Sequence, residues 1–459
     1  MSRARVAQID LPELGMPSVM PRLQPATYHA RMDRFRAAAM ARGLERVVVY
    51  ADREHSANIS YLTGFDPRFE EAVLIVGTDG EPAILVGNEC FGMAGAAPLP
   101  MRRHLYQDLS LPNQPRDRSR SLAEILGDEG IVAGARVGIV GWKAYASPSW
   151  FDAPSYLVDQ IRDLVGPAGS VVNAVDILID PTDGLRTHNE ADQIAAFEYA
   201  SCQTSDGVRR LLFGLRPGMT EQEGVRLLGW NGAPLSCHLM LTAGSRATLG
   251  LLSPSDRVIE HGDRFTTAFG IWGALTCRAG FVTEDASGLP KGIPDYVERL
   301  VAPYFEAVAE WYEALRIGLP GGALQEIIDR RLGDPFFGIF LNPGHLLHLD
   351  EWISSPVGRG SQVPLRSGMV LQVDIIPATR TEYFTSNIED GIAIADAALR
   401  EDIAARYPEA WARIVERRRF MRDSLGITLQ PEVLPLSNIP AYLPPFLLRP
   451  DRVMTLSGT

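Results

Sequence analysis

The side chains best suited to chemistry lie in the last third of the chain. They are one histidine and two acids: His345 in the run GHLLH, Asp374 at the end of VLQVD, and Glu389 in NIEDG. An imidazole beside carboxylates can transfer protons, because a neighbouring carboxylate raises the pKa of the imidazole towards working pH. One histidine with two carboxylates is also a set that can hold a single divalent ion. We therefore predict a proton-transfer site at these three residues, with one ion there as the alternative.

Three further side chains extend this candidate site. From the resemblance given below, we interpret His348 as an additional catalytic residue and Glu351 as a contact to the substrate. Arg278 could hold a substrate carboxylate by a forked contact, and a salt bridge that stabilises the fold is the alternative. Cys277 has no evident base partner, so we interpret it as a packing residue.

The elements that precede this site indicate a separate N-terminal domain. The alternation of apolar and polar residues predicts an α/β arrangement without an obvious catalytic cluster. The predicted helices cover residues 28–43 and 121–126, and the predicted strands cover residues 47–50, 72–76, 83–86 and 136–140. The strands at 72–76 and 83–86 flank the turn residues GTDG, which predicts a hairpin.

The C-terminal half has a different pattern. After a break at 180–186, the capping box of Thr187 and Glu190 predicts the start of a long helix, and a second box joins Thr220 and Glu223. Short strands then alternate with helices, which indicates an α+β domain with an antiparallel sheet. The expected strands are 265–271 and 369–376, and the expected helices are 296–315 and 396–425. We expect the proline-rich tail, 431–450, to pack on the surface as an extended segment.

The composition excludes several classes of function. A net charge of −12 opposes general affinity for nucleic acids or anionic membranes. Four cysteines without CxxC spacing suit a reducing compartment. No apolar run is long enough for a signal peptide or a membrane span. We therefore expect a cytoplasmic protein that acts on a small molecule, with neither nucleic acid nor membrane as a partner.

Several motifs resemble the creatinase, prolidase and aminopeptidase P group. The run NISYLTGF (58–65) is similar to a strand and turn of that group, and LRTHNE (185–190) with RPGMTE (216–221) resembles its entry helix and the following turn. The later landmarks 262–263, 344–345, 368–370 and 388–390 are also similar in order and spacing. The resemblance implies an α/β creatinase-like N-terminal domain at 20–180. It also implies an α+β pita-bread domain with a curved antiparallel sheet at 181–450, and a homodimer.

The resemblance also implies a pair of metal ions held by two Asp, one His and two Glu, because several carboxylates must offset the repulsion between the ions. In this chain the first Asp position is Ala268, and the second falls on Leu275 or Cys277. His345, Asp374 and Glu389 match the other three positions. A second histidine of the group is missing, and His348 and Glu351 are its candidate replacements. We therefore expect no dinuclear centre and no other cofactor, with one divalent ion as the possible exception.

Three functions remain open at this point. The first is a hydrolase or lyase of the creatinase type that acts on a small amino-acid-like or amide substrate without a normal dinuclear centre. The second is a non-catalytic binding or regulatory protein that keeps the fold, which the loss of both aspartates favours. The third is an Xaa-Pro aminopeptidase or dipeptidase, which is disfavoured because little remains to lower the pKa of an attacking water between two ions.

Overall fold

The computed structural model describes residues 3–456, and these form two compact units. The N-terminal unit comprises residues 23–186, and the C-terminal unit comprises the remaining described residues. The first residues of the chain therefore belong with the C-terminal unit, which the sequence did not indicate. Among the helices of residues 3–456, none combines the length and hydrophobicity needed to cross a bilayer.

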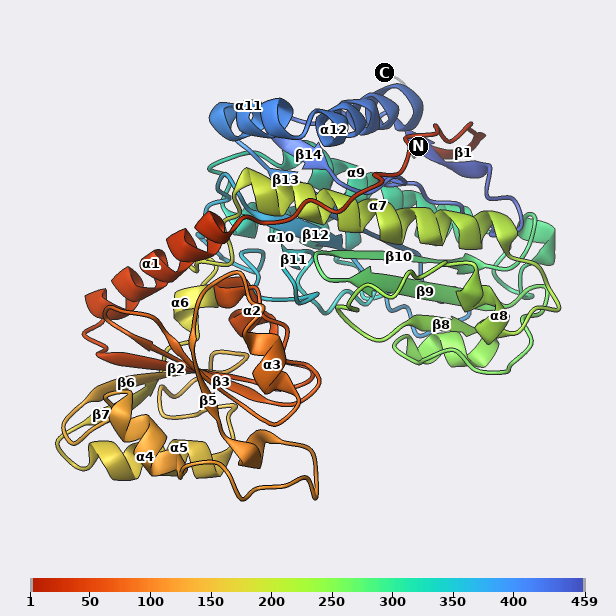
Figure 1. Ribbon diagram of the computed structural model, residues 1–459. Coiled ribbons are helices and arrows are strands. Elements are labelled where there is room, and N and C mark those ends of the chain that lie inside the picture. Colours follow the sequence, from red (N-terminus) through yellow and green to blue (C-terminus); the bar gives the residue numbers. More distant parts are fainter. Residues whose placement is uncertain (1–2, 457–459) are drawn as a thin grey trace. The chain divides into compact units, whose positions relative to one another are not determined.

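The N-terminal unit is built on a six-stranded mixed sheet with the order β5-β4-β3-β2-β6-β7. The strands are β2 (Arg46–Ala51), β3 (Ala72–Gly77), β4 (Ala83–Val86), β5 (Arg102–Leu105), β6 (Arg136–Val140) and β7 (Ser170–Asn173). The helices are α1 (Pro25–Ala41), α2 (Ala57–Thr63), α3 (Cys90–Ala94), α4 (Leu122–Asp128), α5 (Ser155–Val165) and α6 (Asp176–Ile179). Helices α4 and α5 lie together on one face of the sheet, where their apolar side chains form a core with the strands (Figure 1).

Most elements predicted for this unit are confirmed, and one motif is corrected. The hairpin of β3 and β4 is present as an antiparallel pair. The run NISYLTGF, expected as a strand and turn, is instead helix α2. Gly64 ends this helix in the left-handed conformation at φ 74° and donates its N–H to Ser60, which only a residue without a side chain does at little cost. Burial of every residue of α2 outweighs the strand preference of its isoleucine, tyrosine and threonine.

The C-terminal unit contains a seven-stranded antiparallel sheet with the order β11-β12-β13-β10-β9-β8, and β14 pairs with β13 beside this path. Its strands are β8 (Met240–Ala243), β9 (Arg264–Ile271), β10 (Ala274–Phe281), β11 (His345–Leu346), β12 (Val370–Asp374), β13 (Asn387–Ile394) and β14 (Val433–Pro435). A separate two-stranded ribbon joins β1 (Ala4–Gln8) to β15 (Arg452–Leu456). The predicted combination of an α/β sheet with a curved antiparallel α+β sheet is thus confirmed.

Helix α7 (Ala191–Gly214) runs along strands β9 and β10 of this sheet (Figure 1). The other helices are α8 (Glu221–Arg226), α9 (Ala302–Ala314), α10 (Gly321–Leu332), α11 (Ala397–Arg406) and α12 (Pro408–Phe420). The capping box at Thr220 and Glu223 is confirmed. The one expected at Thr187 is wrong, because Glu190 is the N-cap and makes no side-chain cap bond. The backbone N–H of Asn189 instead bonds to the carbonyl of Gly368 at 2.8 Å, so the preceding residues are held outside the helix.

The proline-rich tail is a second correction, because it lies inside the unit and not on its surface. Leu434, Leu436, Ile439 and Tyr442 are all fully buried. Burial of these apolar residues stabilises the unit. The prolines between them are tolerated because the segment is irregular and their missing N–H groups are not needed for a regular hydrogen-bond ladder. The tail therefore packs against strands β13 and β10.

Candidate active site

One row of side chains crosses the sheet of the C-terminal unit at the predicted site. The strand register pairs Met240 with Ala268, Ala268 with Cys277, Cys277 with Glu389, and Glu389 with Asp374. Residues directly opposite each other on neighbouring antiparallel strands point to the same face of the sheet. The row therefore begins apolar on β8 and ends with two acids on β13 and β12. Of the two candidates for the second aspartate position, the register puts Cys277 in this row.

The row points away from helix α7. Thr276, which alternates with Cys277 along β10, contacts Thr204 of α7 through their hydroxyl groups at 3.0 Å. Successive side chains of a strand point to opposite faces, so Cys277 must lie on the other side. The candidate site is thus on the face of the sheet that α7 leaves uncovered.

His345 begins the short strand β11, and the residue before it fixes its approach. Gly344 has φ 135°, and a Cβ atom there would lie 2.8 Å from Cζ2 of Trp311. Only glycine allows this close contact. Leu346 and Leu347 are buried, and Leu347 packs in the core with α7.

A tight loop after β11 brings the side chains of Glu351 and Trp352 to the imidazole of His345. Leu346 donates its N–H to Ser354 at 2.7 Å, and Ile353 donates its N–H to Leu346 at 3.1 Å, so the loop closes on itself. Trp352 stacks on the ring of His345 with centroids 4.0 Å apart and an angle of 15°. The loop therefore fixes the plane of the imidazole.

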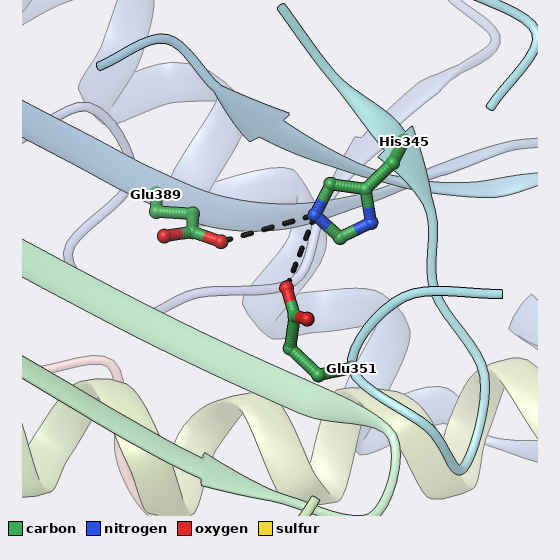
Figure 2. Close-up of side chains that lie close together, drawn as sticks. All are labelled: His345, Glu351 and Glu389. Carbon is green, nitrogen blue, oxygen red and sulfur yellow. Dashed lines mark ion pairs between the residues drawn. The ribbon is translucent and has the colours of Figure 1, made fainter. Parts of the chain in front are cut away.

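The imidazole of His345 lies between two carboxylates, as Figure 2 shows. Its Nε2 atom is 3.2 Å from Oε1 of Glu351 and 3.9 Å from Oε1 of Glu389. Oδ2 of Asp374 lies at the same distance of 3.9 Å from Nε2. His345 is fully buried, whereas the side chain of Glu351 is 27% exposed. Three acids thus converge on one nitrogen, and Glu351 links the site to solvent.

The charges of these groups are strongly coupled. Burial alone would lower the pKa of His345, but the nearby carboxyl groups of Glu351 and Glu389 outweigh burial and raise this pKa to about 10. Burial and the charge of Glu389 raise the pKa of Asp374 well above its ordinary value. Burial also raises the pKa of Glu389, against the opposing effect of His345. The imidazole of His345 is therefore protonated at neutral pH, and Asp374 favours its neutral form.

The residues of the row do not fit a pair of metal ions. Ala268 offers a methyl group, and burial followed by the charge of Glu389 raises the pKa of Cys277 well above its usual range, so the thiol keeps its proton. A single ion fits better, because ligand atoms of His345, Glu351 and Glu389 lie within 4.8 Å of one another. In the one-ion set, Glu351 thus stands where the sequence analysis predicted Asp374.

Arg278 and His348 lie elsewhere. The guanidinium of Arg278 is buried and donates to the carboxylate of Asp390 at 2.8 Å and to the carbonyls of Tyr442 and Ile439 at 2.7 and 2.6 Å. These contacts assign Arg278 to the salt bridge that the sequence left as an alternative, and not to a substrate carboxylate. The ring of His348 packs edge-on against Phe197 of α7, with centroids 5.1 Å apart.

Comparisons with solved structures decide the fold. A prolidase from Pyrococcus horikoshii OT3 superposes with a TM-score of 0.62 and 16% identity over 80% of this chain and 95% of that chain. An X-Pro aminopeptidase from Thermotoga maritima MSB8 gives a TM-score of 0.61 and 15% identity over 80% of this chain and 95% of that chain. This chain has the pita-bread fold of the creatinase, prolidase and aminopeptidase P group.

Sequence comparison adds a distant likeness to this fold assignment. The uncharacterized peptidase YqhT of Bacillus subtilis (strain 168) is 25% identical over 228 residues, which cover 47% of this chain and 62% of YqhT. The chain thus matches less than two thirds of this relative's length. No known family profile matches the chain. The pita-bread fold is established by these findings, and the chemistry must be argued from the site.

The sequence named His345, Asp374, Glu389 and Glu351 but did not indicate how they are arranged. Trp352 was not singled out, although an aromatic residue next to Glu351 was the available signal. Cys237, whose pKa is raised to about 12 by burial and by the charges of Glu351 and Glu389, was also missed. No local motif marks it, because the segment around it reaches the site through pairing with β9, which is distant in sequence.

Proposed function

We propose that this protein hydrolyses a carbon–nitrogen bond in a small amide or amino-acid-like substrate, with His345 as general acid. The observation that carries the proposal is the position of its Nε2 atom, 3.2 Å from Glu351 and 3.9 Å from both Glu389 and Asp374. An imidazolium held between carboxylates can deliver its proton to a leaving nitrogen. The names of the similar proteins, which are prolidases, dipeptidases and aminopeptidases, are consistent with cleavage of such a bond.

The remaining groups divide the other tasks. Glu351 is the more exposed carboxylate, and we assign it the role of general base that takes a proton from water as the water oxygen attacks the carbonyl carbon. The carbon–nitrogen bond then breaks, and the nitrogen takes the proton of His345. Glu389 stabilises the imidazolium by its charge, and Trp352 is a positioning residue that holds the ring in plane.

A hydrolase with one divalent ion at His345, Glu351 and Glu389 is the second candidate, because their ligand atoms cluster within 4.8 Å. An ion there would polarise a substrate carbonyl as a Lewis acid. A centre with two ions is not proposed, because Ala268 and the protonated Cys277 provide no charge for it.

The test combines element analysis with activity. Purified protein is analysed for manganese, iron, zinc and cobalt, and turnover of X-Pro dipeptides, small amides and guanidino compounds is measured with and without a chelator. We expect His345→Gln to lower turnover by about 10²- to 10⁴-fold, the usual contribution of a general acid. His261→Gln is the matched control, because His261 forms a similar pair with Glu284 at 2.7 Å on the surface.

Each outcome distinguishes the candidates. Turnover that survives the chelator and depends on His345 supports the metal-independent hydrolase. One equivalent of metal with chelator-sensitive turnover supports the second candidate. Two equivalents with cleavage of X-Pro peptides, or wild-type turnover in His345→Gln, would refute the proposal, and absence of turnover across the panel would favour a binding protein.

A further inference from the structure

Ala268 and Cys277, which stand where the resemblance implies metal-binding acids, belong to an apolar patch that we define as Met240, Ala268, Leu275 and Cys277. These four residues make up a hydrophobic cluster of their own, separate from the core beneath α7, and half-buried Cys237 packs against it. Met240, Ala268 and Cys277 belong to the row described above, and Leu275 lies two residues from Cys277 on the same face of β10. The apolar patch therefore occupies the uncovered face of the sheet.

The patch is less completely covered than the opposite face of the same strands. Met240 and Ala268 are 8% and 7% exposed, whereas neighbouring Leu241 and Phe265 on the same strands are fully buried. Burying this remaining apolar area would be favourable, because each methylene removed from water contributes about 0.8 kcal/mol.

The patch is continuous with the acidic end of the row. Cys277 pairs directly with Glu389, and Ala268 and Met240 follow on the next two strands. At a strand spacing of about 4.8 Å, the patch extends roughly 10 Å from Cys277 to Met240. Cys237 lies close enough to Glu351 and Glu389 for both charges to act on its thiol. One ligand can therefore contact the acids and the patch together.

The two ends of the row suit different chemical groups of a ligand. The acidic end has the three carboxyl groups of Glu351, Asp374 and Glu389 and one imidazole. The guanidinium on β10, Arg278, is bonded to Asp390 and to backbone carbonyls. Oδ1 of Asp374 is buried and has no hydrogen-bond partner among the described residues, and Asp374 is only 6% exposed. Such an end suits a nitrogen group that donates hydrogen bonds. The apolar end offers only methyl, methylene and thiol groups.

We propose that the apolar patch is a substrate subsite for an aliphatic chain whose nitrogen group is held by Glu351, Asp374 and Glu389. This inference rests on the proposed function and adds its substrate class: amides whose nitrogen carries an unbranched aliphatic arm of up to about eight carbons. The length follows from the extent of the patch, since a carbon chain advances by somewhat less than its bond length of about 1.5 Å per bond.

The test uses primary n-alkylamines from ethylamine to hexylamine as probes, with binding followed by calorimetry. For the wild-type protein we expect affinity to rise about fourfold for each of the first added methylenes, which corresponds to about 0.8 kcal/mol each. Ala268→Leu fills the patch, so it should bind ethylamine as the wild type does and lose the dependence on chain length. If that variant does not fold, Leu275→Ala serves instead and should reduce the gain per methylene.

The results separate this inference from the proposed function. Equal affinity for ethylamine and hexylamine, or no binding by any amine, overturns the subsite. An unchanged length dependence in both Ala268→Leu and Leu275→Ala overturns it as well. None of these results alters the dependence of turnover on His345, which tests the proposed function on its own.

Discussion

A buried ion cluster between α7 and α12 permits a quantitative prediction about stability. Glu198 of α7 bonds to Arg417 at 2.7 Å and to Arg413 at 2.8 and 2.7 Å, and Glu198 and Arg417 are almost completely buried. Glu198→Gln removes the charge and leaves a buried guanidinium without its carboxylate. Breaking a buried pair in this way costs about 3 to 5 kcal/mol. We expect this loss in the free energy of unfolding, measured by urea titration at pH 7.

The pH dependence of the same variant gives a second reading. Burial would raise the pKa of Glu198, but Arg417 and Arg413 outweigh burial and hold this pKa below its ordinary value. Its stabilising effect is therefore complete above the unfolded pKa of about 4.3 and is lost as pH falls through the lower folded value. Because Glu198→Gln has no such group, the difference between the two proteins should narrow below about pH 4.

The control is Glu416→Gln, which breaks a pair with Arg419 on the same helix, where both side chains are exposed. Exposed pairs contribute at most about 1 kcal/mol, so this variant should differ little from the wild type at any pH. If Glu198→Gln costs no more than Glu416→Gln, or if its stability deficit does not change between pH 7 and pH 3, the reasoning about the buried cluster is refuted.

Three further predictions concern the site and its surroundings. Glu351→Gln should lower kcat by about 10²-fold or more without lowering the melting temperature, because Glu351 is assigned as the base and is partly exposed; kinetics with thermal denaturation checks this. Ala268→Asp combined with Cys277→Asp should retain more divalent metal after dialysis than the wild type, as measured by element analysis, because the row then carries four carboxylates. Arg278→Leu should destabilise the protein by about 3 to 5 kcal/mol in urea titration, because it leaves the buried carboxylate of Asp390 unpaired.

The sequence predicted four of the six strands of the N-terminal sheet, and strands β9 and β12 of the C-terminal sheet, because short apolar runs and turn residues mark them. It failed at NISYLTGF, where β-branched and aromatic residues form a buried helix that ends at Gly64. It failed also at the tail after residue 431, where frequent prolines indicated a surface segment although the residues between them are apolar and buried. In both cases tertiary burial outweighs local preference, and a local pattern cannot report it.

The members of the candidate site were largely identifiable from sequence, but their arrangement was not. His345, Asp374 and Glu389 stand in recognisable runs, and the register brings the last two opposite each other. Glu351, predicted as a substrate contact, is instead the nearest carboxyl partner of His345, because the loop after β11 folds back on its own strand. Arg278, predicted as a substrate contact, instead lies outside the site, because the alternation of side chains along β10 points it towards Asp390 and the tail. Loop closure and strand register are non-local properties.

The stacking of Trp352 on His345 has a spectroscopic consequence. An indole in contact with a protonated imidazole loses fluorescence through electron transfer from its excited state. The emission of Trp352 should therefore be weak while the imidazole of His345 is protonated. The chain has seven tryptophans, and the difference between the wild type and Trp352→Phe isolates this single emitter. Any ligand that draws the proton from His345, or pushes the loop off it, should then brighten the protein, which provides an optical titration of the site for substrates whose turnover cannot yet be followed.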